Sequence, residues 1–135
     1  MITAIDTNVL LDVFTGDPRF GTTSRDMVRR CLAEGVVFAC DVVWAETVAA
    51  FPDEQSAITA MDLLGIGFAA IGQTEAAGAG VAWRDYRRAG GTRDRVVADF
   101  LIGAHAAGRA DRLLTRDRGF YRRYFADLQV IDPSS

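Results

Sequence analysis

The residues best suited to chemistry in this chain are four acids that lie far apart in the sequence: Asp6, Glu46, Asp99 and Asp117. Each adjoins a short apolar run; residues 2–5, for example, lead directly into Asp6, and residues 113–114 shortly precede Asp117. Short apolar runs that feed helical segments predict a parallel α/β sheet, and such sheets carry their chemistry beyond the carboxyl ends of the strands. We therefore expect the four carboxylates to meet at one edge of a sheet.

Carboxylates gathered in this way predict a metal site. Two of them about 5 Å apart repel each other by roughly 3 kcal/mol at an effective dielectric constant of 20. A set of oxygen ligands without histidine or cysteine favours a hard divalent cation, Mg²⁺ or Mn²⁺. Such an ion lowers the pKa of a bound water, orients a phosphodiester and neutralises the leaving oxygen. The pattern therefore points to phosphodiester hydrolysis, with one of the acids also able to accept the proton of the water.

The composition is that of an ordinary globular protein, and we expect a single domain over residues 1–135. Half of the residues are hydrophobic, but no apolar run is long enough to span a membrane. Acidic residues interrupt the N-terminal apolar stretch, which argues against a signal peptide, so we expect a cytoplasmic protein. Cys31 and Cys40 lie in apolar surroundings and are expected to be buried free thiols.

The net charge of −3 hides an asymmetry along the chain. Residues 1–83 carry 4 arginines against 11 acids, whereas residues 84–135 carry 11 arginines against 7 acids. Arginines clustered beside a metal site suit a phosphate-bearing polymer, because a guanidinium pairs bidentately with phosphate. Taken singly, most of them also fit a solvated surface. The RNA-binding candidates are Arg84, Arg87, Arg88, Arg93, Arg116 and Arg118. The chain has no lysine, which excludes a P-loop.

The alternation of apolar runs and turn residues predicts an α/β fold of three layers, α/β/α, around a central, mainly parallel sheet. The expected strands are 2–5, 36–40, 68–71, 112–115 and 128–131. The expected helices are 7–14, 22–34, 42–51, 54–65, 74–89 and 95–108, with a short one around Tyr121. The candidate N-caps of these helices include Thr22 or Thr23, Asp41 and Asp94.

Three stretches carry acids in similar apolar settings: AIDTNVLL at 4–11, ADFLIGAHA at 98–106 and LLTRDRGF at 113–120. In this order, with Glu46 on an intervening helix, they resemble the PIN-domain family over essentially the whole chain. The resemblance is closest to its VapC branch, the ribonuclease toxins of VapBC toxin–antitoxin modules. It implies a PIN-like fold in which Mg²⁺ or Mn²⁺ is bound by four acids, here Asp6, Glu46, Asp99 and Asp117.

The resemblance also bears on the residues around these acids. Asn8 and Thr115 match the polar positions that support the site, where an amide and a hydroxyl orient carboxylates. Gly119 is a departure, because many members have a further acid at this position, two residues after the one matched by Asp117. The four-acid core is therefore implied, whereas the number of metals, one or two, stays open.

The expected function is that of a metal-dependent endoribonuclease, the toxin of a type II toxin–antitoxin system. The resemblance implies an RNA substrate and a VapB-like antitoxin, whose tail would enter the acidic cleft and present an arginine to the carboxylates. The resemblance also implies a homodimer, for which apolar residues of helices 42–51 and 54–65 would supply the interface. Two alternatives stay open: a PIN-type RNA-processing nuclease without a toxin role, and an inactive RNA-binding module.

Several residues also have plain structural explanations. Asp6 can serve as a helix cap, Glu46 can be a surface residue of its helix, and Asp12 is expected to be solvated. The sole histidine, His105, lies among small apolar residues and is expected to pack rather than catalyse. Tyr121 and Tyr124, among arginines, are candidates for exposed stacking on RNA bases, whereas Trp44 is expected in the core. Receiver-type and haloacid-dehalogenase-type sites are set aside, because both require a lysine.

Overall fold

The computed structural model describes residues 1–134, so Ser135, the last residue of the expected domain, lies outside the described residues. Its sheet has the strand order β3-β2-β1-β4-β5, and every neighbouring pair is parallel. The strands are β1 (Ile2–Ile5), β2 (Val36–Ala39), β3 (Gly67–Phe68), β4 (Arg112–Leu114) and β5 (Val130–Ile131). The prediction of a central, mainly parallel sheet is confirmed.

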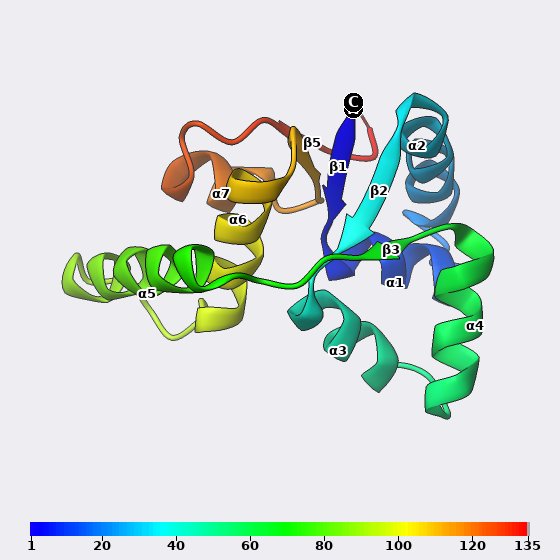
Figure 1. Ribbon diagram of the computed structural model, residues 1–135, viewed down its shortest axis with the longest axis horizontal. Helices are drawn as coiled ribbons and strands as arrows, with labels where there is room; N and C mark the ends of the chain where they lie inside the picture. Colours follow the sequence, from blue (N-terminus) through cyan, green and yellow to red (C-terminus); the bar gives the residue numbers. More distant parts are fainter. Residues whose placement is uncertain (135) are drawn as a thin grey trace.

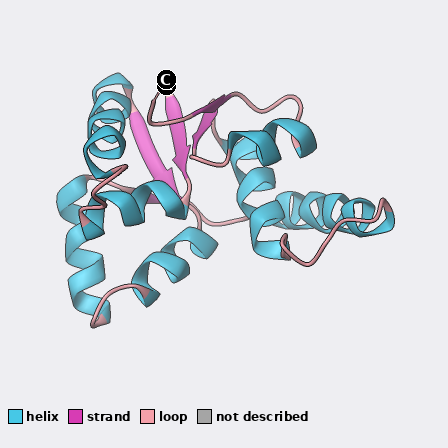
Figure 2. Ribbon diagram, turned by 180° about the vertical axis from the view of Figure 1, so that it is seen from behind, coloured by secondary structure: helices cyan, strands magenta, loops and turns pink. Residues whose placement is uncertain are grey.

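Helices cover the sheet on both sides, as the layered prediction requires. Figure 1 shows α5, α6 and α7 gathered on one side of β1 and β2 and the α2 and α4 helices on the other, and Figure 2 gives the reverse view. The helices are α1 (Thr7–Thr15), α2 (Gly21–Glu34), α3 (Asp41–Ala49), α4 (Glu54–Leu64), α5 (Gln73–Arg88), α6 (Val97–Arg109) and α7 (Arg118–Tyr124). Among the described helices, none has the length and apolar character needed to cross a membrane.

The central strands are buried because both faces of the sheet are covered. Ile5, Val37 and Leu113 are each at most 1% exposed and belong to a single core cluster. Continuous apolar strands are the expected pattern for a parallel sheet covered on both faces. The two cysteines are free and buried, as predicted.

Strand register brings distant segments together at the carboxyl edge of the sheet. Ile5, the last residue of β1, pairs with Leu114, the last residue of β4. The ladder continues one step further, where the amide N–H of Asp6 donates to the carbonyl of Leu114 at 2.9 Å. The residues after β1 and after β4 therefore leave the sheet side by side, although more than 100 positions separate them in the sequence.

The helix expected at 95–108 begins later, at Val97, and Asp94 does not cap it. The residue that reaches back to the helix start is Asp99, whose carboxylate accepts a hydrogen bond from the amide N–H of Val96 at 3.3 Å. The preceding loop is held elsewhere, because the Tyr86 hydroxyl donates to the carbonyl of Thr92 at 2.9 Å. This later start places Asp99 in the first turn of α6.

Two other predicted caps are wrong. The α2 helix begins at Gly21, and the Thr23 hydroxyl donates to the carbonyl of Phe20 instead of accepting from the helix. Asp41 is the first residue of α3, and its side chain accepts a hydrogen bond from the amide N–H of Ile71 instead of capping its own helix.

The two outer strands are shorter than predicted. The β3 strand covers 67–68 instead of 68–71, and β5 covers 130–131 instead of 128–131. Only two residues of each find a partner on the neighbouring strand. At β3 the chain makes one more hydrogen bond, from Ala69 to Ala39, and then leaves the sheet towards α5.

The connection from α2 into β2 depends on a glycine. A Cβ atom at Gly35 would collide with the carbonyl oxygen of Met1, which accepts the hydrogen bond from Val36 that starts the β1–β2 pairing. Gly35→Ala should therefore lower the free energy of unfolding by about 2–3 kcal/mol, as overpacking does. Urea unfolding measures this change.

Gly78→Ala is the matched control. This glycine lies on an exposed part of α5, and a Cβ there meets nothing within 4 Å. Because alanine is a better helix former than glycine by about 1 kcal/mol, this variant should gain stability. Equal effects of the two substitutions would contradict the close approach at Gly35.

Candidate metal centre

All four predicted acids lie at the carboxyl edge of the sheet, each on a different element. Asp6 is the N-cap of α1, and Asp117 is the N-cap of α7, three residues beyond β4. Glu46 lies in α3, the helix that follows β2, and Asp99 lies in the first turn of α6. Two of the acids are thus helix N-caps, and the other two lie within helices that start at this edge.

Asp6 is a buried carboxylate, only 6% exposed, that is held by neutral donors. One oxygen accepts from the amide N–H of Thr7 at 2.7 Å, and the other accepts from the Thr115 hydroxyl at 2.8 Å and the Asn8 amide at 3.3 Å. Burial raises the pKa of Asp6 to about 6, and the negative charge of Glu46 acts in the same direction. Hydrogen bonds from Thr115, Thr7 and Tyr121 oppose this rise.

Thr7 ties Glu46 to Asp6. Its amide N–H binds Asp6, while its hydroxyl donates to Glu46 Oε1 at 2.7 Å. Sequence reasoning missed this residue, although its position directly after Asp6 was a local signal. Among residues 1–134, no arginine lies within ion-pairing distance of either carboxylate. This half of the site therefore carries negative charge without a cationic partner.

Asp99 is electrostatically coupled to the other acids. Partial burial raises its pKa, and the charges of Asp117 and Glu46 raise it further. The hydrogen bond from Val96 and the positive charge of Arg95 lower it. Its position within the field of acids from two other elements supports a single common site.

In the other half of the site, Asp117 is paired with a cation, Arg95, which sequence reasoning did not single out. Arg95 donates from both terminal nitrogens to its two carboxylate oxygens, and the Nη2–Oδ1 bond measures 3.1 Å. The guanidinium also lies 4.2 Å from the centre of the Phe120 ring. The partners are 22 positions apart, and Arg95 lies in a loop, so no helical or strand spacing reveals the pair. The Asp117 amide N–H donates to the Thr115 hydroxyl at 3.0 Å.

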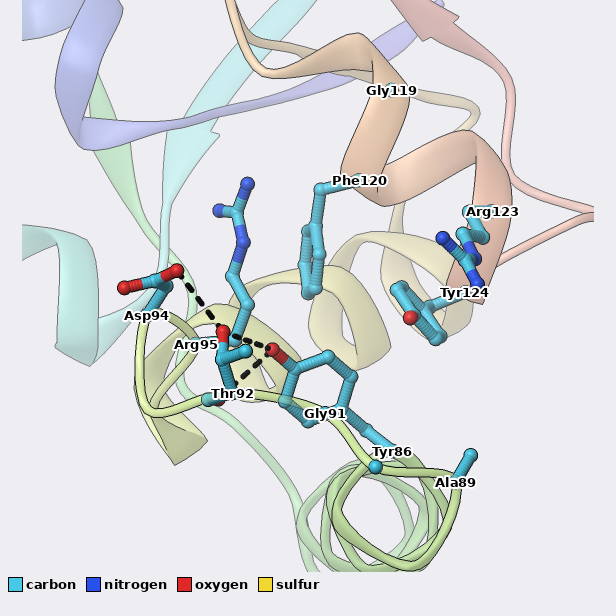
Figure 3. A pocket seen from close by; sticks show the side chains of 11 residues that line it. Tyr86, Ala89, Gly91, Thr92, Asp94, Arg95, Gly119, Phe120, Arg123 and Tyr124 are labelled. Carbon is cyan, nitrogen blue, oxygen red and sulfur yellow. Dashed lines mark hydrogen bonds between the residues drawn. The ribbon is translucent and has the colours of Figure 1, made fainter.

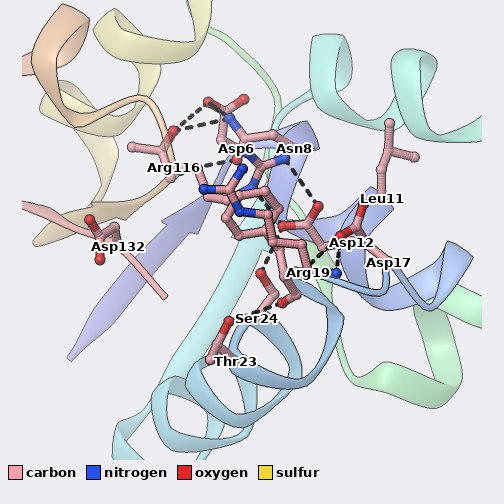
Figure 4. A network of polar contacts seen from close by, with 12 residues as sticks. Asp6, Asn8, Leu11, Asp12, Asp17, Arg19, Thr23, Ser24, Arg116 and Asp132 are labelled. Atoms are coloured by element: carbon pink, nitrogen blue, oxygen red, sulfur yellow. Dashed lines mark hydrogen bonds and ion pairs between the residues drawn. The ribbon is translucent and has the colours of Figure 1, made fainter. Parts of the chain in front are cut away.

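Asn8 links the acids to a second network, shown in Figure 4. Its side-chain oxygen accepts from the amide N–H of Arg116 at 3.1 Å. The Arg116 guanidinium pairs bidentately with Asp12 at 2.7 and 3.1 Å, and the Ser24 hydroxyl donates to the same carboxylate at 2.8 Å. Asp12 is 3% exposed, so the expectation that it is solvated is wrong. Its burial is compensated by Arg116 and Ser24.

The predicted RNA-binding arginines fall into two groups. Arg116 and Arg118 are held in ion pairs with the buried acids Asp12 and Asp132. The others are exposed at the end of α5 and in the loop after it: Arg84, Arg87, Arg88 and Arg93. The second group is therefore the more accessible to a polyanion, although Arg84 lies 3.5 Å from the exposed Asp85 and Arg87 stacks on Trp83.

The remaining candidates take mostly structural places. His105 is 1% exposed and packs edge-on against Phe38, as expected for a packing residue. Tyr121 is also 1% exposed, so its predicted exposed contact with RNA is wrong. Its hydroxyl instead contributes a hydrogen bond to Asp6. Tyr124 is half-buried, and Trp44 packs partly buried against the core.

The four acids fit a divalent cation by their chemistry, although they are not closed around one point. Among residues 1–134, no three Asp, Glu, His or Cys side chains converge closely enough to hold a metal ion as they stand. Each acid instead accepts hydrogen bonds from its own chain, from Thr7, Thr115, Val96 or Arg95. The ligand atoms are nevertheless all carboxylate oxygens, and among the described residues no arginine is paired with Asp6 or Glu46. Such a site suits Mg²⁺ or Mn²⁺.

Comparison with known proteins decides the family. The family model for the PIN domain matches residues 3–126, which are most of the chain. The chain belongs to the PIN domain family. No curated protein matches the sequence.

Solved structures share the fold of this PIN domain. VapBC2 from Rickettsia felis, bound to a DNA fragment from the promoter, has a TM-score of 0.75 at 17% identity, with 98% of each chain covered. VapBC-1 from nontypeable Haemophilus influenzae has the same TM-score and identity, with both chains covered completely. VapC20 from Mycobacterium tuberculosis, described as a toxin that cleaves the sarcin–ricin loop, has a TM-score of 0.61 at 15% identity and covers 94% of this chain and 98% of its own.

Stability should depend on pH through Asp6. Between pH 3.8 and about 6 the folded chain holds a proton on Asp6 that the unfolded chain has released. The free energy of unfolding should therefore fall as pH rises through this range, by at most about 3 kcal/mol from this residue. The Asp6→Asn variant should lack this component. Urea unfolding of both proteins from pH 4 to 8, without divalent cations, measures it; a pH-independent difference between them would contradict the assignment.

Metal affinity should respond to Arg95, because its guanidinium competes for Asp117. Removal of this positive charge should strengthen Mn²⁺ binding, by about tenfold if the pair contributes about 1.4 kcal/mol to the competition. Calorimetric titration of Arg95→Ala with Mn²⁺ tests this. Arg93→Ala, which removes an exposed arginine from the same loop, should bind Mn²⁺ as the wild type does. Unchanged or weaker binding by Arg95→Ala would count against competition at Asp117.

Proposed function

We propose that this PIN domain is a metal-dependent endoribonuclease and the toxin of a type II toxin–antitoxin system. The observation that carries the proposal is the coupled set of Asp6, Glu46, Asp99 and Asp117 at the carboxyl edge of the sheet. The fold adds support, because the similar solved structures include VapBC structures, a toxin–antitoxin complex and a toxin described as cleaving the sarcin–ricin loop.

Asp6, Glu46 and Asp99 would hold the cation, and Asp117 would join them when Arg95 moves away. A bound Mg²⁺ or Mn²⁺ supplies a water of lowered pKa and neutralises charge that develops on the phosphate. Thr115 and Asn8 keep the Asp6 carboxylate oriented, and Thr7 does the same for Glu46. Such polar neighbours fix the direction of ligand oxygens and thereby raise affinity for the metal.

RNA would reach this site along the exposed arginines at the end of α5 and in the loop that follows: Arg84, Arg87, Arg88 and Arg93. Contacts from these arginines to phosphate would position the strand and make binding sensitive to salt, while carrying no information on sequence. The arginine cluster thus accounts for affinity, and any selectivity has to come from other contacts.

The partner would be a VapB-like antitoxin. The Rickettsia felis and Haemophilus influenzae structures are both described as VapBC. An antitoxin arginine would find a site suited to it, because Asp117 already accepts a bidentate guanidinium from Arg95. Self-association stays a prediction, and an apolar groove of about 520 Å³ between α3 and α4 is the candidate surface for it. Its lining includes Trp44, Val48 and Ile58.

Asp99→Asn should abolish RNA cleavage while the chain stays folded. The substitution keeps the side-chain size and the ability to accept from Val96, but it removes the charge that a cation requires. Cleavage of total RNA in Mg²⁺ or Mn²⁺ should fall by at least about a hundredfold, the range seen when a major charge-stabilising group is lost. Circular dichroism and thermal unfolding confirm that the variant is folded.

Asp62→Asn is the matched control, because Asp62 is an exposed acid on α4 away from the carboxyl edge. This variant should cleave RNA as the wild type does, and chelation of the metal should stop both proteins. Full activity of Asp99→Asn would overturn the site. Cleavage that persists in the presence of a chelator would overturn its dependence on metal.

A further inference from the structure

A pocket of about 460 Å³ lies beside Asp117, between the loop that precedes α6 and the α7 helix. Figure 3 shows three aromatic rings and two arginines around it. We call it the aromatic pocket, and its principal lining residues are Tyr86, Thr92, Arg95, Phe120, Arg123 and Tyr124. Its volume is in the range of sites that bind small organic molecules.

The loop wall of the aromatic pocket is fixed in place. The Tyr86 hydroxyl donates to the carbonyl of Thr92 at 2.9 Å, and the backbone of Gly91 lies directly on the Tyr86 ring. A Cβ at Gly91 would collide with that ring, so only glycine lets the loop approach so closely. The wall is therefore built by specific contacts.

The aromatic rings form one contiguous cluster in which the ring planes are inclined to one another. Tyr124 packs edge-on against Tyr86 with the ring centres 5.4 Å apart, and the centre of the Phe120 ring lies 5.3 Å from that of Tyr124. Tyr86 and Phe120 are almost fully buried, whereas Tyr124 is half-buried and presents part of its ring to the pocket. Nucleic-acid bases stack on such rings, and on guanidinium planes, irrespective of base identity.

Two guanidinium groups lie over these rings. The Arg95 guanidinium is 4.2 Å from the Phe120 ring centre, and that of Arg123 is 5.4 Å from the Tyr124 ring centre. Arg123 has no acid within ion-pairing distance among the described residues. The one acid of the lining, Asp94, is hydrogen-bonded to the Thr92 hydroxyl and lies on the other side of Thr92 from the rings (Figure 3). The pocket is thus aromatic. Arg123 is the arginine of its lining without an acidic partner among the described residues, because Arg95 is paired with Asp117.

Arg95 connects the aromatic pocket to the metal centre. One guanidinium lines the pocket, stacks on Phe120 and binds both oxygens of Asp117. A group bound in the pocket therefore lies next to the acids, and an anion attached to it can meet Arg95. A base joined to a phosphate satisfies both requirements, since the base suits the rings and the phosphate suits the guanidinium.

We propose that the aromatic pocket binds the base of a nucleotide that adjoins the cleaved phosphodiester, with Arg95 receiving the neighbouring phosphate. The inference rests on the proposed ribonuclease function. It adds a contact to a base, whereas the exposed arginines would contact phosphates. The nucleotide belongs to a single-stranded part of the RNA, because a base has to leave its stack to enter a pocket.

The first test is equilibrium binding of a fluorescent single-stranded RNA oligonucleotide in the presence of a chelator, so that cleavage is absent. Arg123→Ala should weaken binding by about tenfold, whereas Arg122→Ala should weaken it less than twofold. The two residues are adjacent exposed arginines on α7, but only Arg123 lines the pocket. Tyr124→Leu should lose as much affinity as Arg123→Ala, and Tyr124→Phe, which keeps the ring, should retain it. Thermal unfolding verifies that each variant is folded.

The second test is competition for the labelled RNA by adenosine 5′-monophosphate and by inorganic phosphate. The nucleotide should displace RNA from the wild type at a concentration at least about tenfold lower than phosphate does, and Tyr124→Leu should erase the difference. Equal competition by phosphate would reveal a simple anion site and would overturn the inference. An equal loss on Arg122→Ala and Arg123→Ala would overturn it as well, because it would indicate diffuse attraction alone.

Cleavage kinetics in excess Mn²⁺ separate this inference from the function on which it rests. Arg123→Ala and Tyr124→Leu should raise KM by about tenfold with little change in kcat, since they alter binding of a part of the substrate that does not react. If the wild type cleaves RNA and both variants keep its KM, the pocket is not a base site although the ribonuclease function holds. If the wild type neither cleaves nor binds RNA, the function and the inference fail together.

Discussion

The pairing of β1 with β4 is the constraint on which the site depends. It sets Ile5 opposite Leu114, and one hydrogen bond beyond the strands, from Asp6 to Leu114, carries the two chains past the edge of the sheet together. Asp6 and Thr115 meet as a result, and Asp117 follows within two residues. The same pairing buries the Asp6 carboxylate, because the surrounding strands and helices form the core. The β1–β4 pairing therefore both builds the sheet and buries the Asp6 carboxylate, whose burial costs free energy.

The chain handles the gathered negative charge in two different ways. Around Asp6 and Glu46 it supplies only neutral donors, so that the pKa of Asp6 rises to about 6 and the carboxylates lack a positive partner. At Asp117 it supplies a guanidinium, Arg95, that neutralises the charge and stacks on an aromatic ring. The first half favours a divalent cation, and the second favours contact with an anionic substrate once Asp117 is released. This division fits the proposed ribonuclease, in which metal and phosphate bind side by side.

Local patterns explain what could be predicted from the sequence. The parallel sheet, and the placement of acids at its carboxyl edge, follow from apolar runs that precede Asp6, Glu46 and Asp117. Contacts between loops and distant elements left no such pattern. Arg95 finds Asp117 from a loop of no regular spacing, and Asp12 is buried because Arg116, 104 positions away, reaches it. The start of α6 was also misplaced, because Tyr86 holds the preceding loop at Thr92.

Acids from separate elements are thus proposed to bind divalent metal together at the carboxyl edge of the sheet. A crystal structure of the chain grown with Mn²⁺, with data collected at an energy where manganese scatters anomalously, would show whether they do. We expect an anomalous peak in contact with carboxylate oxygens of Asp6 and Asp99, with the hydrogen bonds from their own chain rearranged around it. If a structure in saturating Mn²⁺ shows no peak at this edge, and every carboxylate is still bound to its own donors, the acids do not form a metal site.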